Sequence, residues 1–184
     1  MTFLPLIAPM VLLAIAGALT LRPAARGHWM LRLPEWGALL ALALGIASAI
    51  GYALIGPATS PLIGGATVGL SVGVDVVSLA MFLTVGMVGW VVLRYSRVAL
   101  DGEDRQSPFM AGMAVTLACV MLLVTAGNLV QLVLAWVAVG VGLHRLLLFY
   151  PDRPRAQRAA KKKTVSGIIG SAALVGAAGL MVWG

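Results

Sequence analysis

Ionisable side chains that stand in or beside long apolar stretches are the residues of this chain best suited to chemistry. Asp75 lies near the start of one such stretch, His144 near the end of another, and Lys162 just before a third. An ionisable group is costly inside a bilayer and is by default a functional hypothesis there. We therefore take all three as candidates for an ion pathway or for coupling, and His144 also because imidazole titrates near neutral pH.

Each of these residues also has a structural interpretation. Asp75 suits a helix N-terminus near the outer interface, where the helix macrodipole favours an anion. His144 suits an interfacial histidine bonded to a lipid or a carbonyl. Lys162, within the run Lys161 to Lys163, suits a signal that fixes topology. The sequence leaves both interpretations open.

Uncharged side chains add weaker candidates. Trp136 lies in the middle of an apolar stretch, deeper than an interfacial tryptophan. We therefore expect it to pack between helices or beside a cavity, and we count it with the ion-pathway candidates. Asn128 and Gln131 are three residues apart and could bond across helices, for about 0.6 kcal/mol each. We interpret this pair as structural.

No enzymatic pattern accompanies these residues. The sequence has no phosphate-binding loop, no dinucleotide-binding glycine motif, no His-Glu pair for a metal, and no credible nucleophile with a base. Cys119 is the only cysteine and lies within an apolar run, which suits a small buried hydrophobe. We predict no catalytic centre, no cofactor and no metal.

The composition excludes a soluble globule. The chain is 61% hydrophobic and 10% charged, whereas soluble domains are about 45–50% apolar and about 25% charged. The net charge of +7 does not predict nucleic-acid binding, because the Lys and Arg residues form short clusters between apolar runs without interleaved aromatics. The expected surroundings are the lipid bilayer.

Six continuous apolar runs account for most of the chain, each near the roughly 20 residues that cross a bilayer once. They cover Phe3 to Leu21, Trp36 to Ile55, Val72 to Tyr95, Phe109 to Ala126, Leu129 to Tyr150, and Thr164 to Trp183. Continuous runs favour helices over the alternating strands of a barrel. We predict an all-α, polytopic membrane protein with about six transmembrane helices.

The connections predict the orientation. Gly127-Asn128, between the fourth and fifth runs, tolerates left-handed backbone and predicts the tight turn of a helical hairpin. The first, third and fifth connections carry all the loop charge, and loops rich in Lys and Arg stay cytoplasmic. The N-terminus, with the second and fourth connections, is therefore predicted to face outside. Residues 145–163 are predicted to form a basic cytoplasmic loop.

From Val74 onward, the order of motifs resembles the antiporter-like membrane subunits of respiratory complex I (subunit 5) and of Mrp antiporters. The matching stretches are Val74-Asp-Val-Val-Ser78, Tyr95 with the Asp101-Gly-Glu loop, Ala126-Gly-Asn-Leu129 leading to Ala135-Trp136, Gly140-Val-Gly142, and Leu146-Leu-Leu-Phe-Tyr150. Within that group, Leu143 to Pro154 and Ala159-Ala-Lys-Lys-Lys163 look most like the membrane subunit (DabB-type) of the DAB inorganic-carbon accumulation complex.

The resemblance divides the chain into two parts. Residues 1–71 are expected to hold two transmembrane helices and an outer loop. Residues 72–184 are expected to hold antiporter-like helices three to six. The resemblance implies a membrane subunit, in the bacterial cell inner membrane, of a complex that takes up carbon dioxide or bicarbonate on a cation gradient, with protons as the expected cation. It implies a cytoplasmic, zinc-containing, carbonic-anhydrase-like partner. We expect Arg145, Asp152, Arg153 and Arg155 to contact a partner, either a soluble cytoplasmic protein or a neighbouring membrane subunit.

Three departures from the family pattern are visible. Val137 stands where the pumping subunits carry a glutamate, and Gly167-Ile-Ile-Gly-Ser171 replaces a charged motif. The chain also has fewer spans than these relatives, so other membrane subunits or a C-terminal half are expected as partners. Two alternatives stay open, an accessory or proton-translocating subunit of a complex I-like or Mrp-like assembly, and a structural membrane scaffold without an ion path.

Overall fold

The computed structural model describes residues 4–21, 29–56, 58–59, 63–64, 69–103, 105–149 and 154–183. Within these ranges each predicted run contains a helix, which confirms the all-α class. The helices are α1 (Leu4–Leu21), α2 (Leu33–Ile55), α3 (Val76–Ala99), α4 (Gln106–Val124), α5 (Leu129–Leu147) and α6 (Pro154–Trp183), with a 3-10 turn, η1 (Met30–Arg32), before α2.

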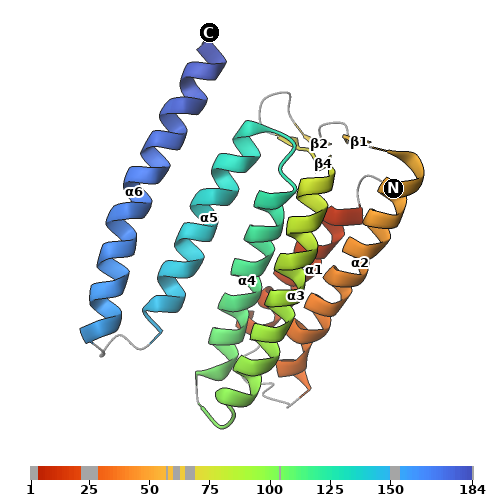
Figure 1. Ribbon diagram of the computed structural model, residues 1–184. Helices are drawn as coiled ribbons and strands as arrows, with labels where there is room; N and C mark the ends of the chain where they lie inside the picture. The colour runs from red at the N-terminus through yellow and green to blue at the C-terminus, as the bar shows by residue number, and fades with distance from the viewer. Residues whose placement is uncertain are drawn as a thin grey trace.

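The helices form an up-and-down bundle in which α2, α4 and α6 begin at the end where α3 and α5 finish (Figure 1). α4 contacts α1, α3 and α5, so it lies at the centre of the packing. α6 packs along α5 at the edge of the bundle (Figure 1). The alternating direction agrees with the predicted topology, while the outward orientation of the N-terminus stays a prediction.

The core lies among α1, α2, α3 and α4. Its largest fully buried side chains include Leu12, Phe82, Leu93, Met110 and Met121. Alanines fill the positions where the helices approach closely, as small residues do between helices in lipid; the buried ones in this core are Ala8, Ala16, Ala38, Ala41, Ala111, Ala114 and Ala118. Cys119 is a buried free thiol, as its apolar surroundings predict.

Several helices have the length and composition of membrane spans. In the described part of the chain, four pass this test, Met30–Leu54, Val76–Ala99, Gln106–Val124 and Leu129–Leu147, and Pro5–Leu21 is a shorter apolar helix. Exposed apolar side chains cover the outer faces of α3, α5 and α6. Such faces suit lipid, which is as apolar as they are, so the chain is a polytopic membrane protein.

Two helix boundaries differ from the predicted runs. The third helix begins at Val76, not at Val72, because Asp75 is its N-cap and residues 73–74 form a short strand. The predicted basic loop 145–163 is wrong in its extent. α5 continues to Leu147 and α6 begins at Pro154, because proline suits the first helical turn and Ala, Lys, Arg and Gln are good helix formers.

The connection between α2 and α3 contains two short antiparallel pairs. β1 (Ala58–Thr59) pairs with β4 (Gly73–Val74), and β2 (Ile63–Gly64) pairs with β3 (Gly69–Leu70). They satisfy backbone groups at one end of the bundle, where helix hydrogen bonding has ended. These two-residue strands leave the fold class unchanged.

The turn between α4 and α5 forms the predicted helical hairpin, but the predicted left-handed backbone is wrong. Asn128 has φ −139°, and in the described residues a positive φ occurs at Gly56 and Gly102. Glycine is needed at 127 for a different reason: a Cβ there would lie 2.7 Å from Ser71 Oγ and 3.0 Å from Gly73 N. The turn is therefore packed tightly against the chain that enters α3.

The proposed division at residue 72 crosses one continuous bundle. α1 packs against α4, and α2 packs against α3. The division remains a prediction about where the sequence resemblance begins.

Candidate functional site

A polar junction joins the end of α5 to the start of the apolar part of α6. Thr164 Oγ1 lies 3.0 Å from His144 Nδ1 and donates to the Ala160 carbonyl at 2.8 Å. Because a hydroxyl has one hydrogen to donate, the His144 Nδ1 is assigned as the donor to Thr164. The Nε2 of a neutral His144 is then the nitrogen that can accept a proton.

Lys163 reaches the same turn of α5. Its ammonium donates to the Gly140 carbonyl, and Gly140 is one helical turn before His144. Adjacent residues of α6, Lys163 and Thr164, therefore hold a single turn of α5. We call His144, Lys163, Thr164 and the Gly140 carbonyl the α5–α6 junction.

The lysine that turns inward is Lys163, whereas the Lys162 side chain is exposed. Lys162 was the sequence candidate, because the sequence shows a run of three lysines but not which one faces the neighbouring helix. Which lysine faces α5 depends on the rotation of α6 about its axis, and packing against α5 sets that rotation. An ion-pathway role for Lys162 stays a prediction with no contact to support it.

The α5–α6 junction has bases but no acid. Neither α5 nor α6 contains Asp or Glu, and in the described residues the ion pairs involve Glu35. In the same part of the chain no cluster of His, Cys, Asp or Glu suits a metal ion. Among the described residues, no carboxylate therefore pairs with Lys163 or His144.

Trp136 and Val137 lie on the outer surface of α5. Their exposed fractions are 45% and 42%, so in this chain Trp136 does not pack between helices as expected. The described neighbours of α5 are α4 and α6, which cover the faces carrying Gly142 and Gly140. Val137, where the resemblance predicts a glutamate, faces outward from the bundle.

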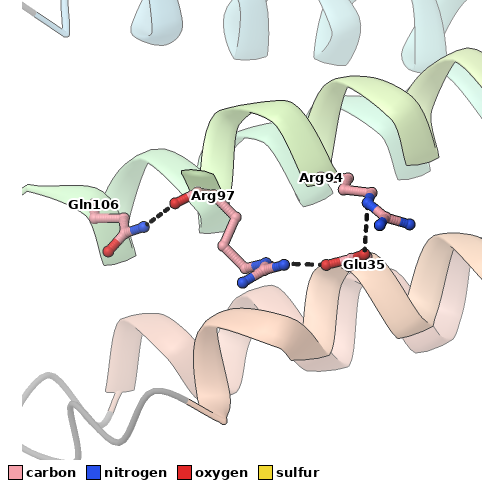
Figure 2. Close-up of polar contacts among 4 residues, drawn as sticks. All are labelled: Glu35, Arg94, Arg97 and Gln106. Atoms are coloured by element: carbon pink, nitrogen blue, oxygen red, sulfur yellow. Dashed lines mark hydrogen bonds and ion pairs between the residues drawn. The ribbon is translucent and has the colours of Figure 1, made fainter. Parts of the chain in front are cut away.

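A second polar cluster ties α2, α3 and α4 together (Figure 2). Glu35 Oε2 accepts from Arg97 Nε at 3.0 Å, Glu35 Oε1 lies 3.9 Å from Arg94 Nε, and Gln106 Nε2 donates to the Arg97 carbonyl at 2.7 Å. Glu35 is 13% exposed and Arg97 is 20% exposed. Glu35 also lies in the first turn of α2, where the macrodipole favours an anion.

Asp75 caps α3 at the opposite end of the bundle. Its Oδ1 accepts from Ser78 N at 2.6 Å, and Ser78 Oγ accepts from Asp75 N at 2.9 Å, a reciprocal capping box. The hydrogen bond from the Ser78 backbone, followed by that from its hydroxyl, lowers the pKa of Asp75 below its usual 3.8. This geometry gives Asp75 a helix-capping task, and an ion-pathway role for it stays a prediction.

Asn128 and Gln131 bind the chain that enters α3. Asn128 Oδ1 caps α5 by accepting from Gln131 N at 2.6 Å, and Asn128 Nδ2 donates to Ser71 Oγ at 3.2 Å. Gln131 Oε1 accepts from Ser71 N at 2.9 Å, and Gln131 Nε2 donates to the Leu122 carbonyl of α4 at 3.4 Å. Part of the pair's bonding is thus across helices, as expected, and part is to Ser71.

The predicted partner contacts are described only in part. Arg145 is exposed at the end of α5. Asp152 and Arg153 lie outside the described residues, and Arg155 lies in the first turn of α6. Their contact with a partner stays a prediction.

Sequence reasoning missed Glu35, Arg97, Lys163 and Thr164 as interacting residues. Glu35 is an acid beside the basic Arg32 and close to the start of an apolar run, and Arg94 and Arg97 are three residues apart. That pattern could have indicated an ion pair between helix ends. Thr164 carried no comparable signal.

Comparison with curated proteins shows similarity to membrane subunits. The chain is 37% identical over 107 residues to the probable inorganic carbon transporter subunit DabB of Hydrogenovibrio crunogenus, covering 58% of this chain and 21% of that protein. It is 43% identical over 108 residues to DabB2 of Halothiobacillus neapolitanus, covering 59% and 20%. NADH-quinone oxidoreductase subunit L of Escherichia coli is 32% identical over 108 residues, covering 59% and 18%.

The chain spans about a fifth of the length of these relatives. A search of family models found no match. Among solved structures, a chain of the membrane-bound sulfane sulfur reductase, an archaeal respiratory membrane complex, shares the fold with a TM-score of 0.73 and 15% identity, over 93% of this chain and 34% of that chain. The chain is thus a multi-pass membrane protein homologous to a segment of DabB inorganic carbon transporter subunits and of the antiporter-like L subunits of NADH-quinone oxidoreductase.

Proposed function

We propose that this chain is a membrane subunit of an inorganic carbon uptake complex driven by a proton gradient, located in a bacterial inner membrane. The observation that carries the proposal is the similarity to the two DabB proteins, at 37% and 43% identity, above the 32% shared with subunit L of Escherichia coli. We expect other membrane subunits as its partners, because both of these relatives are described as transporter subunits.

The α5–α6 junction is the best candidate for coupling. The His144 Nδ1 lies 3.0 Å from Thr164 Oγ1, and this bond would respond to a change in the charge of the imidazole. Lys163 adds a positive charge one turn away, with no carboxylate on either helix. A change of protonation here would alter how α5 and α6 hold each other, and Arg145 on the next residue would carry that change to the bundle end.

The proposed partner is a cytoplasmic, zinc-containing, carbonic-anhydrase-like subunit. It would contact Arg145, Asp152, Arg153 and Arg155 and convert carbon dioxide to bicarbonate. The basic character of this segment supports an acidic surface on the partner. The zinc chemistry belongs to the partner in this proposal.

A second candidate is a subunit of a complex I-like respiratory assembly. The similarity to NADH-quinone oxidoreductase subunit L favours it. The two candidates differ in what co-purifies from native membranes: a zinc protein of the carbonic anhydrase kind for the first, and several antiporter-like or redox subunits for the second.

The test is accumulation of radiolabelled bicarbonate in cells that express this chain together with the suspected zinc subunit. We expect deletion of this chain to abolish accumulation and expression in trans to restore it. Unchanged accumulation after the deletion would remove the proposal. Co-purification with redox subunits and no zinc protein would select the respiratory alternative.

A further inference from the structure

An apolar stripe on the outer face of α3 leads to an exposed arginine. Met87, Val91, Arg94 and Val98 follow one another at helical spacing and therefore share one face. The exposed fractions are 60% for Met87, 48% for Val91 and 66% for Val98, and the Arg94 side chain is 60% exposed. Arg94 lies within two turns of the end of α3 at Ala99, where a span meets the interface.

Arg94 differs from its neighbour Arg97, although both face Glu35. Arg97 Nε is bonded to Glu35 at 3.0 Å, whereas Arg94 Nε lies at 3.9 Å, beyond normal hydrogen-bond length. The Glu35 carboxylate thus lies between two guanidinium groups and is hydrogen-bonded to that of Arg97. Arg94 keeps donors and positive charge for another anion.

The position of Arg94 is held without using its donors. Its Cζ lies 5.6 Å from the centroid of the Trp90 ring, within the range of a cation–π interaction. Tyr95, the next residue, is 72% exposed, and tyrosine is enriched at the headgroup level of membranes. We therefore expect the guanidinium to lie at the depth of lipid phosphates.

We propose that Arg94 and the stripe of Met87 and Val91 bind an anionic phospholipid. The guanidinium would donate to the phosphate in the bidentate manner that suits arginine, and an acyl chain would lie along the apolar stripe. The stripe favours a lipid over free phosphate, because free phosphate gains nothing from apolar side chains. The proposal is independent of the transport role.

The test is native mass spectrometry of the detergent-purified full chain after incubation with phosphatidylglycerol or phosphatidylcholine vesicles. We expect phosphatidylglycerol to be retained in preference to phosphatidylcholine. Arg94→Gln should weaken that retention about fivefold, since one basic residue at an anionic surface contributes about 1 kcal/mol. Arg94→Lys should retain most of it.

Arg105→Gln is the matched control, because it removes the same charge from the same bundle end. The Arg105 side chain is exposed and donates to the Phe149 carbonyl, and it lies before α4 rather than on the stripe. A loss of lipid as large as that of Arg94→Gln would overturn the proposal, because it would indicate general surface attraction. Equal retention of both lipids, or displacement by inorganic phosphate, would also overturn it.

Discussion

Two polar clusters lie toward the same end of the bundle and differ in whether an acidic side chain balances the basic ones. In the cluster of Glu35, Arg97 and Gln106, an acid, a base and an amide join three helices, and Glu35 and Arg97 are mostly buried. In the α5–α6 junction, His144 and Lys163 meet a hydroxyl and a carbonyl and no acid. The first arrangement pairs opposite charges across helices, whereas in the second, among the described residues, no carboxylate pairs with Lys163.

The difference follows from position in the fold. α2, α3 and α4 belong to the tightly packed body, where an unpaired charge would be expensive. α6 lies at the edge and packs along α5, with Val165, Ile168 and Ile169 exposed. A polar contact at the edge can break and re-form at lower cost, which suits coupling better than scaffolding.

The largest expected effect is on transport, through the α5–α6 junction. His144→Ala and Lys163→Met should each abolish bicarbonate accumulation while the complex still assembles, because the lost hydrogen bonds contribute only about 1 kcal/mol each to stability. Uptake normalised to complex recovered from membranes measures this. Arg105→Gln, at the same bundle end, is the control expected to leave uptake intact. Full uptake in His144→Ala would show that the α5–α6 junction is not needed for coupling and does not differ in this from the ion-pair cluster.

The next largest effect is on stability, through the ion-pair cluster. Glu35→Gln should lower the free energy of unfolding by about 2 kcal/mol, between the values for exposed and buried pairs, because Arg97 then loses its partner. Thermal unfolding in detergent measures the change. Uptake per assembled complex should stay near wild type. A specific loss of uptake would indicate that the ion-pair cluster, and not only the α5–α6 junction, takes part in coupling.

A comparable effect is expected at the opposite end of the bundle. Gly127→Ala should destabilise the chain by about 2 kcal/mol, because its Cβ would meet Ser71 and the Gly73 backbone at 2.7 to 3.0 Å. Gly167→Ala, with open space around the added Cβ, is the matched control. If both variants unfold at the same temperature, Gly127 does not lie as close to Ser71 and Gly73 as the structure shows.

The smallest effect concerns the cap of α3. Asp75→Asn keeps a capping side chain and removes the charge, so it should cost about 0.5 kcal/mol at neutral pH. The folded state lowers the pKa of Asp75, so its charge stabilises the fold above the usual carboxyl pKa and ceases to do so as the pH falls through the lowered pKa. Unfolding of both proteins should therefore converge in acid, and a gap that widens in acid would contradict the assignment.

The sequence predicted the helices well and their contacts poorly. Apolar runs and positive clusters locate helices in a membrane protein because each span must satisfy its own backbone. The run of Lys161 to Lys163 did not reveal that Lys163 faces α5, since that depends on the phase of α6 in the bundle. Gly127 was recognised as a turn residue for its backbone freedom, although the close approach of Ser71 is what requires it.

The most direct test of the account is uptake of labelled inorganic carbon by the assembled complex as the proton gradient is removed with a protonophore. We predict that the wild-type rate falls to the rate of His144→Gln, and that His144→Gln itself no longer responds to the protonophore. Uptake that persists without the gradient, or a His144→Gln variant that still depends on it, would contradict the α5–α6 junction as the coupling site.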